Sequence, residues 1–166
     1  MSTIKQFIDS ALKWLVITIM AVITLNVLWQ VFSRFILASP SSYTEELARY
    51  LLVWLGILGA SYVAGQKMHL AIDLLSVNLN HKGKALLDII IQICIFTFSL
   101  FVMVIGGTRL VMITLTLNQI SAALQVPLGY VYIVLPVSGL IMMFYSVYFI
   151  ADEIALLNKL NQEEIR

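Results

Sequence analysis

The stretch TEELARYLLVWLGILGASY places two glutamates and an arginine directly before a run apolar enough to enter a membrane. Glu45 and Arg49 are one helical turn apart, in the acid-first order that favours an ion pair on a helix. Glu46 adds a second carboxylate to the same turn. Charge near hydrocarbon is costly, so these groups need neutralising partners. We interpret them as members of a charge network rather than as catalytic groups.

Two explanations of this cluster stay open. Ser42 or Thr44 can cap the helix, and the glutamates suit the positive end of its dipole, which makes the cluster a capped helix entrance. Alternatively, Arg34, which ends the preceding apolar segment, approaches the glutamates across a short turn. Two glutamates exceed what a cap needs, which leaves room for a basic group of a partner protein. We therefore favour the network.

Motifs for catalysis or cofactor binding are scarce. The single cysteine, Cys94, lies inside an apolar run, and the sequence contains no C-x-x-C pair, Gly-rich phosphate loop or nucleophile-and-base arrangement. His69 and His81 fall in one polar connection, whereas haem ligands of membrane proteins usually lie within the helices. We expect no enzymatic activity, no metal site and no cofactor.

The composition indicates a membrane protein. Of the 166 residues, 61% are hydrophobic and 11% are charged, whereas about a quarter of the residues of a soluble domain are charged. The net charge of +1 gives no reason to expect nucleic-acid binding. Lipid is therefore the expected solvent of most of the surface.

Four segments are long enough to cross a membrane, which takes about 20 mostly apolar residues. Their approximate ranges are 12–37, 47–64, 85–115 and 128–150. The sequence therefore predicts an all-α integral membrane protein, with residues 1–166 forming one membrane domain of four transmembrane helices. The third helix is longer than a hydrocarbon core of about 30 Å requires, so we expect it to tilt strongly, or else to emerge from the membrane. Pro136 lies inside the fourth helix and should kink it.

The connection between the second and third helices has apolar residues at helical spacing among polar ones. This pattern predicts a short amphipathic helix over about 67–80 that lies in the membrane interface. A partly ordered loop with incidental apolar residues is the alternative.

Lysine and arginine in the short connections predict the orientation. One side carries Lys5, Lys13, Lys67, Lys82, Lys84, Lys159 and Arg166. The other side carries Arg34, Arg49 and Arg109. Because cytoplasmic loops carry the excess of positive residues, we expect both termini in the cytoplasm.

Two features of the first two helices predict helix packing. A polar stripe follows every fourth position of the first helix: Thr18, Val22, Asn26, Gln30 and Arg34. We expect Asn26 and Gln30 to form hydrogen bonds between helices, with a substrate path lined by amides as the alternative. On the second helix, Gly56, Ala60 and Ala64 form a ridge of small residues that lets another helix approach closely.

Aromatic side chains allow two further expectations. Trp54 is either an anchor at a fixed membrane depth or a side chain in an interface. The tyrosines of the fourth helix lie near its two ends, where interfacial aromatic residues gather, so we expect them to form such a belt. They are Tyr130, Tyr132, Tyr145 and Tyr148.

Several motifs of the chain occur together and in the same order in one known family. They are WQVFSRF, TEELARYLLVWLGILGASY, HLAIDLL and LQVPLGYVYIVLPVSGLIMMFY. With these motifs the sequence resembles the small membrane subunit of TRAP transporters, the DctQ family, over about residues 26–148. The block from Glu45 to Trp54 is the most specific part of this resemblance.

The resemblance implies a tripartite transporter of the bacterial inner membrane. Its other parts would be a large membrane subunit that carries sodium ions and substrate, and a periplasmic substrate-binding protein. The small subunit would anchor the large one, and the substrate would be an organic acid such as a sialic acid or a C4-dicarboxylate. For Glu45, Glu46, Arg49, Tyr50 and Trp54 it implies roles in an interface or in folding. A free-standing four-helix protein, either a small exporter or an assembly factor, is the alternative.

Overall fold

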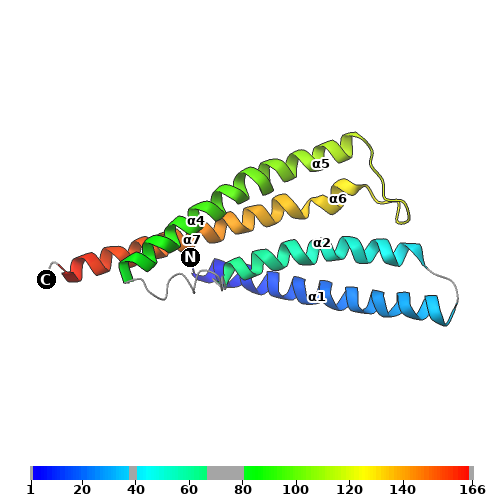
Figure 1. The fold of residues 1–166 in the computed structure, drawn as a ribbon, viewed down its shortest axis with the longest axis horizontal. Helices are drawn as coiled ribbons and strands as arrows, with labels where there is room; N and C mark the ends of the chain where they lie inside the picture. Colours follow the sequence, from blue (N-terminus) through cyan, green and yellow to red (C-terminus); the bar gives the residue numbers. More distant parts are fainter. Residues whose placement is uncertain (1, 38–40, 67–80, 165–166) are drawn as a thin grey trace.

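The computed structural model describes residues 2–37, 41–66 and 81–164, and it contains four helices long and apolar enough to cross a membrane (Figure 1). The first two are α1 (Ser2–Phe35) and α2 (Ser42–Gly65). The third combines α4 (His81–Phe98), the π-helix η1 (Ser99–Gly106) and α5 (Gly107–Thr116). The fourth combines α6 (Leu128–Tyr132) and α7 (Val134–Glu164). The predicted all-α membrane fold with four spanning helices is confirmed.

The helices extend beyond the apolar segments from which they were predicted. α1 begins at Ser2, in a polar stretch, and α7 continues to Glu164. At 1.5 Å per residue, the 31 residues of α7 cover roughly 47 Å, more than a hydrocarbon core of about 30 Å. The interfacial helix expected over 67–80 lies outside the described residues.

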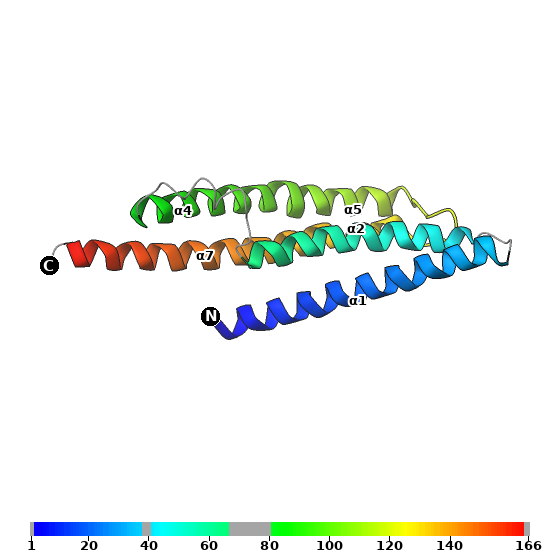
Figure 2. The ribbon, with the colours of Figure 1, turned by 60° about the horizontal axis from the view of Figure 1, so that its bottom comes forward.

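The four helices lie side by side in a row rather than around a common axis (Figures 1 and 2). α1 packs on α2, α2 packs on α7, and α7 packs on α4 and η1. α1 and the third helix therefore occupy opposite edges of the row, and both views show this order. The start of α1 and the end of α7 lie toward the same end of the molecule, as an even number of crossings requires.

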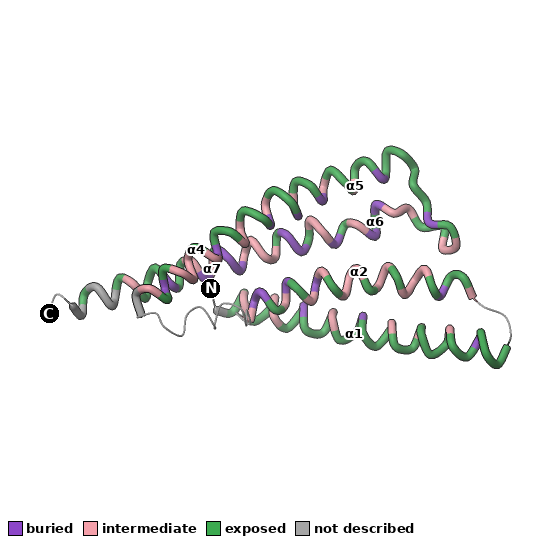
Figure 3. Tube along the Cα trace, viewed as in Figure 1, coloured by how far each residue is buried: buried purple, intermediate pink, exposed green. Residues whose placement is uncertain are grey.

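The core lies mainly along the two inner helices. Its buried side chains include Leu58 of α2 and Val134, Tyr145 and Phe149 of α7. α1 adds Leu12 and Ile19 to this core, although most of its length is exposed along the edge of the row (Figure 3). Because the exposed residues of α1 are largely apolar, they suit contact with lipid or with another membrane protein.

The start of α2 is not capped as the sequence predicted. The N-cap of α2 is Ser41, and its side chain makes no capping hydrogen bond, so the expected cap by Ser42 or Thr44 is wrong. The Thr44 hydroxyl instead donates to the Ser41 carbonyl at 2.8 Å.

In the fourth helix, regular α-helix stops between Tyr132 and Val134. Pro136 lacks the amide that would bond to the carbonyl four residues earlier, which accounts for the interruption.

Candidate functional site

The Glu46 carboxylate binds the backbone of the loop that joins the third helix to the fourth. Its Oε2 accepts hydrogen bonds of 2.8 Å from the amides of Ala123 and Leu124, and Oε1 accepts one of 3.1 Å from Ala122. Oε1 also accepts a bond of 2.8 Å from the Tyr50 hydroxyl. Successive amides that converge in a turn form an anion-binding concavity, and hydrogen bonds to a carboxylate are stronger than neutral ones. Glu46 thus fastens α2 to the loop.

The loop has a shape that suits this role. Asn118 and Gln125 adopt positive φ angles of 48° and 54°, which reverse the chain at each side of the Glu46 contact. Between them, the Ser121 amide donates to the Val126 carbonyl at 3.0 Å, and the Val126 amide donates to the Ser121 hydroxyl at 3.2 Å. These two bonds pair the amides of Ser121 and Val126 within the loop. The amides between them, of Ala122, Ala123 and Leu124, donate to the Glu46 carboxylate instead.

Glu45 and Arg49 form a separate ion pair on the outside of α2. Arg49 Nη2 lies 3.2 Å from Glu45 Oε1, and the two side chains are 68% and 64% exposed. An exposed pair of this kind stabilises a protein by about 1 kcal/mol or less. The structure therefore divides the cluster: Glu46 is bound within the chain, whereas Glu45 and Arg49 are accessible to a partner.

Arg34 lies near this pair at the loop end of α1. A polar hollow of about 330 Å³ is lined by Gln30, Arg34, Ser41, Ser42 and Glu45. Arg34 is exposed, and its guanidinium stands 5.8 Å from the centre of the Phe35 ring. The hollow thus brings Arg34 and Glu45 to one place without a direct ion pair between them among the described contacts.

Trp54 and Asn26 connect helices within the chain. The Trp54 indole nitrogen donates a hydrogen bond of 2.9 Å to the Val131 carbonyl in α6, beside the interruption of the fourth helix. The Asn26 side-chain amide donates one of 2.7 Å to the Thr44 carbonyl, so it joins α1 to the first turn of α2. Gln30 is half-buried, whereas Thr18 and Val22 of the same predicted stripe are exposed.

The small-residue ridge of α2 is only partly used within the chain. Ala64 is buried, but Gly56 and Ala60 are exposed. A Cβ atom added at Gly56 would meet nothing within 4 Å. Packing on Gly56 and Ala60 therefore requires another molecule and stays a prediction.

A second set of small residues on α2, including Ser61 and Gly65, makes the contact with α7. The Ser61 and Ser138 hydroxyls lie 2.5 Å apart, and Ser138 also donates to the Ile57 carbonyl at 3.2 Å. Both serines are fully buried. Small residues four apart, Ser61 and Gly65, were visible in the sequence, but their partner on α7 was not.

Tyr145 makes contacts within the chain that the sequence did not predict. It was expected in an interfacial belt, but it is 1% exposed. Its hydroxyl donates a hydrogen bond of 2.5 Å to Asp9 Oδ1, and Lys5 lies 2.7 Å from Asp9 Oδ2. Its ring lies against Gly65, where an added Cβ would come within 2.5 Å of the ring. The belt expectation is therefore wrong for Tyr145.

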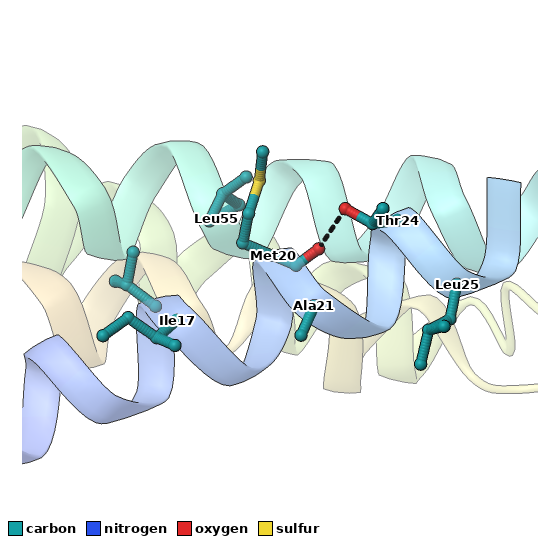
Figure 4. Close-up of a pocket in the computed structure, with 7 residues that line it drawn as sticks. Ile17, Met20, Ala21, Thr24, Leu25 and Leu55 are labelled. Atoms are coloured by element: carbon teal, nitrogen blue, oxygen red, sulfur yellow. Dashed lines mark hydrogen bonds between the residues drawn. The ribbon is translucent and has the colours of Figure 1, made fainter. Parts of the chain in front are cut away.

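An apolar groove opens between α1 and α2 (Figure 4). It has a volume of about 660 Å³ and is lined by Val16, Ile17, Met20, Ala21, Thr24, Leu25 and Leu55. The Thr24 hydroxyl donates to the Met20 carbonyl at 2.9 Å, so the one polar side chain of the lining is satisfied within its helix. Within the described residues, no three His, Cys, Asp or Glu side chains gather where they could hold a metal ion.

The chain is similar to known membrane transport proteins. A family model described as "Tripartite ATP-independent periplasmic transporters, DctQ component" matches residues 9–156. The chain is 30% identical over 145 residues to a Haemophilus influenzae protein assigned as a TRAP transporter small permease protein, with 85% of this chain and 86% of that protein covered.

Three further relatives carry the name of a substrate: sialic acid in two of them and isethionate in the third. The sialic acid TRAP transporter small permease protein SiaQ of Vibrio cholerae is 24% identical over 137 residues, with 79% of each chain covered. The sialic acid TRAP transporter permease protein SiaT of Haemophilus influenzae is 28% identical over 143 residues. That match covers 84% of this chain but 22% of SiaT, so the similar region is a small part of a longer protein.

Proposed function

Because the chain belongs to the DctQ family of tripartite ATP-independent periplasmic transporters, we propose that it anchors the large membrane subunit of a sodium-driven transporter for an organic acid. The family match over residues 9–156 is the observation that carries this proposal. A multi-pass membrane protein of this family is the small component of a transport system, not an enzyme. The anchoring role, the coupling ion and the substrate class are the parts that we propose.

The distribution of charge supports an anchoring role rather than a transport path. Ionisable side chains in the middle of membrane helices typically line ion and substrate paths. In α1 no Asp, Glu, Lys, Arg or His lies between Lys13 and Arg34, and in the fourth helix none lies between Leu128 and Ile150. The charges stand at the helix ends instead, where they can bind water, lipid headgroups or a partner.

The exposed surface supports a protein partner. α1 is exposed along most of its length, and the groove beside Leu55 leaves an apolar hollow between the first two helices. On α2, Gly56 and Ala60 offer a place where a second backbone could come close. We assign the large membrane subunit to these surfaces, with membrane lipid covering the remainder.

The rest of the proposal concerns placement and further partners. We place the protein in the bacterial inner membrane with both termini in the cytoplasm, because lysines gather on that side. The loop end, with Glu45 and Arg49, would then face the periplasm and the substrate-binding protein. The names of two relatives point to sialic acid and that of a third to isethionate, and a C4-dicarboxylate is the second substrate class that we propose.

Reconstituted uptake tests this function. The chain is co-expressed with the large membrane subunit and the binding protein encoded beside it, and the purified complex is placed in liposomes. We expect uptake of sialic acid or a C4-dicarboxylate under an inward sodium gradient, and none under a matched potassium gradient. Omitting the small subunit should abolish uptake. Equal uptake without it, or its failure to copurify with the large subunit, would contradict the anchoring role.

A further inference from the structure

The third helix contains an unusually long π-helical segment. η1 extends over 8 residues, Ser99–Gly106, between α4 and α5. π-helices are rare and mostly occur as single-turn bulges, frequently at functional sites. At its end, the Gly107 amide reaches the carbonyls of Val102, Met103 and Val104, five, four and three residues earlier, and regular α-helix resumes from Gly107.

The buried positions of the third helix show what η1 changes. Ala85, Gln92 and Ser99 are buried at intervals of seven residues, the spacing that keeps one face of an α-helix against a neighbour. The next member of this series would be Gly106, but Gly106 is exposed and Gly107 is buried. Thr114 then follows Gly107 after seven residues. Met103 is buried as well, so the buried face passes through Ser99, Met103 and Gly107 at intervals of four, eight residues in all, before the interval of seven resumes.

Two close contacts with the fourth helix fix the positions on either side of this interval. A Cβ atom added at Gly139 would lie 2.8 Å from Met103 Cβ and 3.2 Å from the Ser99 carbonyl oxygen. A Cβ atom added at Gly107 would lie 3.0 Å from Leu135 Cβ and 3.0 Å from Pro136 Cδ. α7 thus comes close to η1 at Gly139 and to the start of α5 at Gly107, and both contacts depend on a glycine.

We propose that η1 is a register adapter: it takes up one surplus residue and thereby fixes the rotation of α4 relative to α5. Each residue turns an α-helix by about 100°. Counted from Ser99, a continuous α-helix would place Gly106 about 20° and Gly107 about 80° around the helix axis, so Gly107 would turn away from Pro136. The π geometry absorbs the extra residue without rotating either flanking helix away from α7.

Deletion variants test the register adapter. Removing Val102, whose side chain is 54% exposed, should let the segment close as an α-helix with Gln92, Ser99 and Gly107 still facing the fourth helix. We expect the variant to copurify with the large subunit and to elute as one species in detergent. Its melting temperature should lie within about 4 °C of wild type, the shift that about 1 kcal/mol produces in a chain of this size.

Matched deletions outside η1 are the controls. Ile90 of α4 and Ile113 of α5 are also exposed apolar residues, 52% and 44% respectively. Deleting either rotates one end of the third helix by about 100° away from the fourth, so we expect loss of folded protein. Deletion of Phe101 or Ile105 should reproduce the Val102 result, because each leaves the same helix geometry. If all three deletions within η1 are as damaging as the two controls, the register adapter is wrong.

Discussion

The hydroxyl of Tyr145 donates a 2.5 Å hydrogen bond to Asp9, 136 positions earlier in the chain. The contact joins the fourth helix to the first turns of α1, the helix at the edge of the row. Lys5 completes it, because its ammonium lies 2.7 Å from Asp9 and 5.8 Å from the centre of the Tyr145 ring. The cluster gives α1 a polar attachment where most of its surface is otherwise exposed.

Removing the Tyr145 hydroxyl should therefore weaken the fold. Tyr145→Phe keeps the ring but removes a donor to a carboxylate, so we expect a loss of about 2 kcal/mol in the free energy of unfolding. Thermal melting in detergent measures the change. Tyr148→Phe is the control, because the described contacts of Tyr148 are made by its ring. Equal losses in the two variants would mean that the bond to Asp9 does not stabilise the fold.

The ring of Tyr145 leaves no room for a side chain at Gly65. Gly65→Ala places a methyl group within 2.5 Å of Tyr145, so we expect a loss of about 1–3 kcal/mol from overpacking. Gly59→Ala is the matched control on α2, because a Cβ atom there meets nothing within 4 Å. It should be neutral or slightly stabilising, since alanine favours a helix over glycine by about 1 kcal/mol. Thermal melts of the two variants should therefore shift in different directions or by clearly different amounts.

The two neighbouring glutamates should differ in their effect on stability. Glu46→Ala removes four hydrogen bonds, and although the freed amides lie near the surface and can bind water, we expect it to lower the free energy of unfolding more than Glu45→Ala does. Glu45→Ala removes an exposed ion pair and should cost about 1 kcal/mol or less. Chemical unfolding of the two variants measures both costs. A larger loss for Glu45→Ala would contradict the division of the cluster.

Bulky residues on the exposed part of the α2 ridge should affect assembly rather than folding. Gly56→Leu and Ala60→Leu add side chains where this chain has open surface, so each isolated variant should melt like wild type. Copurification with the large subunit should fall in both, because a close-packed neighbour would be pushed away. If both variants copurify normally, the ridge faces lipid.

Cysteine labelling checks the proposed orientation. In a Cys94→Ala background, Thr3→Cys near the start of α1 and Gln119→Cys in the loop between α5 and α6 place single exposed thiols at opposite ends of the helices. An impermeant reagent added outside should label the cysteine at 119 and leave the one at 3 unlabelled. The reverse pattern would invert the protein in the membrane.

The apolar segments sufficed to predict the four helices, because length and hydropathy are local properties of the chain. The end of α7 at Glu164 was not predictable in this way, since its last turns are polar and resemble a loop in composition. The hydrogen-bond partners of Glu46 could not be predicted from the sequence either. They are backbone amides 76–78 positions away, and a backbone amide has no sequence signature. For the same reason the carboxylate looked available to Arg34 or to a partner cation.

The sequence did not show which residues of the third helix face the fourth, for a different reason. Its residues are apolar on nearly every side, so the sequence offered no contrast from which to read a phase. The interval of eight between Ser99 and Gly107 became visible only when burial against α7 was known. Tyr145 was misassigned because a tyrosine near a helix end satisfies the rule for a membrane interface equally well whether it faces lipid or Asp9.

The row of helices divides the chain into two consecutive hairpins. α1 contacts α2, the third helix contacts the fourth, and the seam between the hairpins is mainly α2 against α7. Ser61 and Ser138 lie in this seam and are supplied by different halves of the chain. Each half can therefore pair its own two helices during synthesis, before the other half is present. If the chain were cut between residues 66 and 81 and expressed as two pieces, the contacts between the two hairpins would be the ones that have to form again.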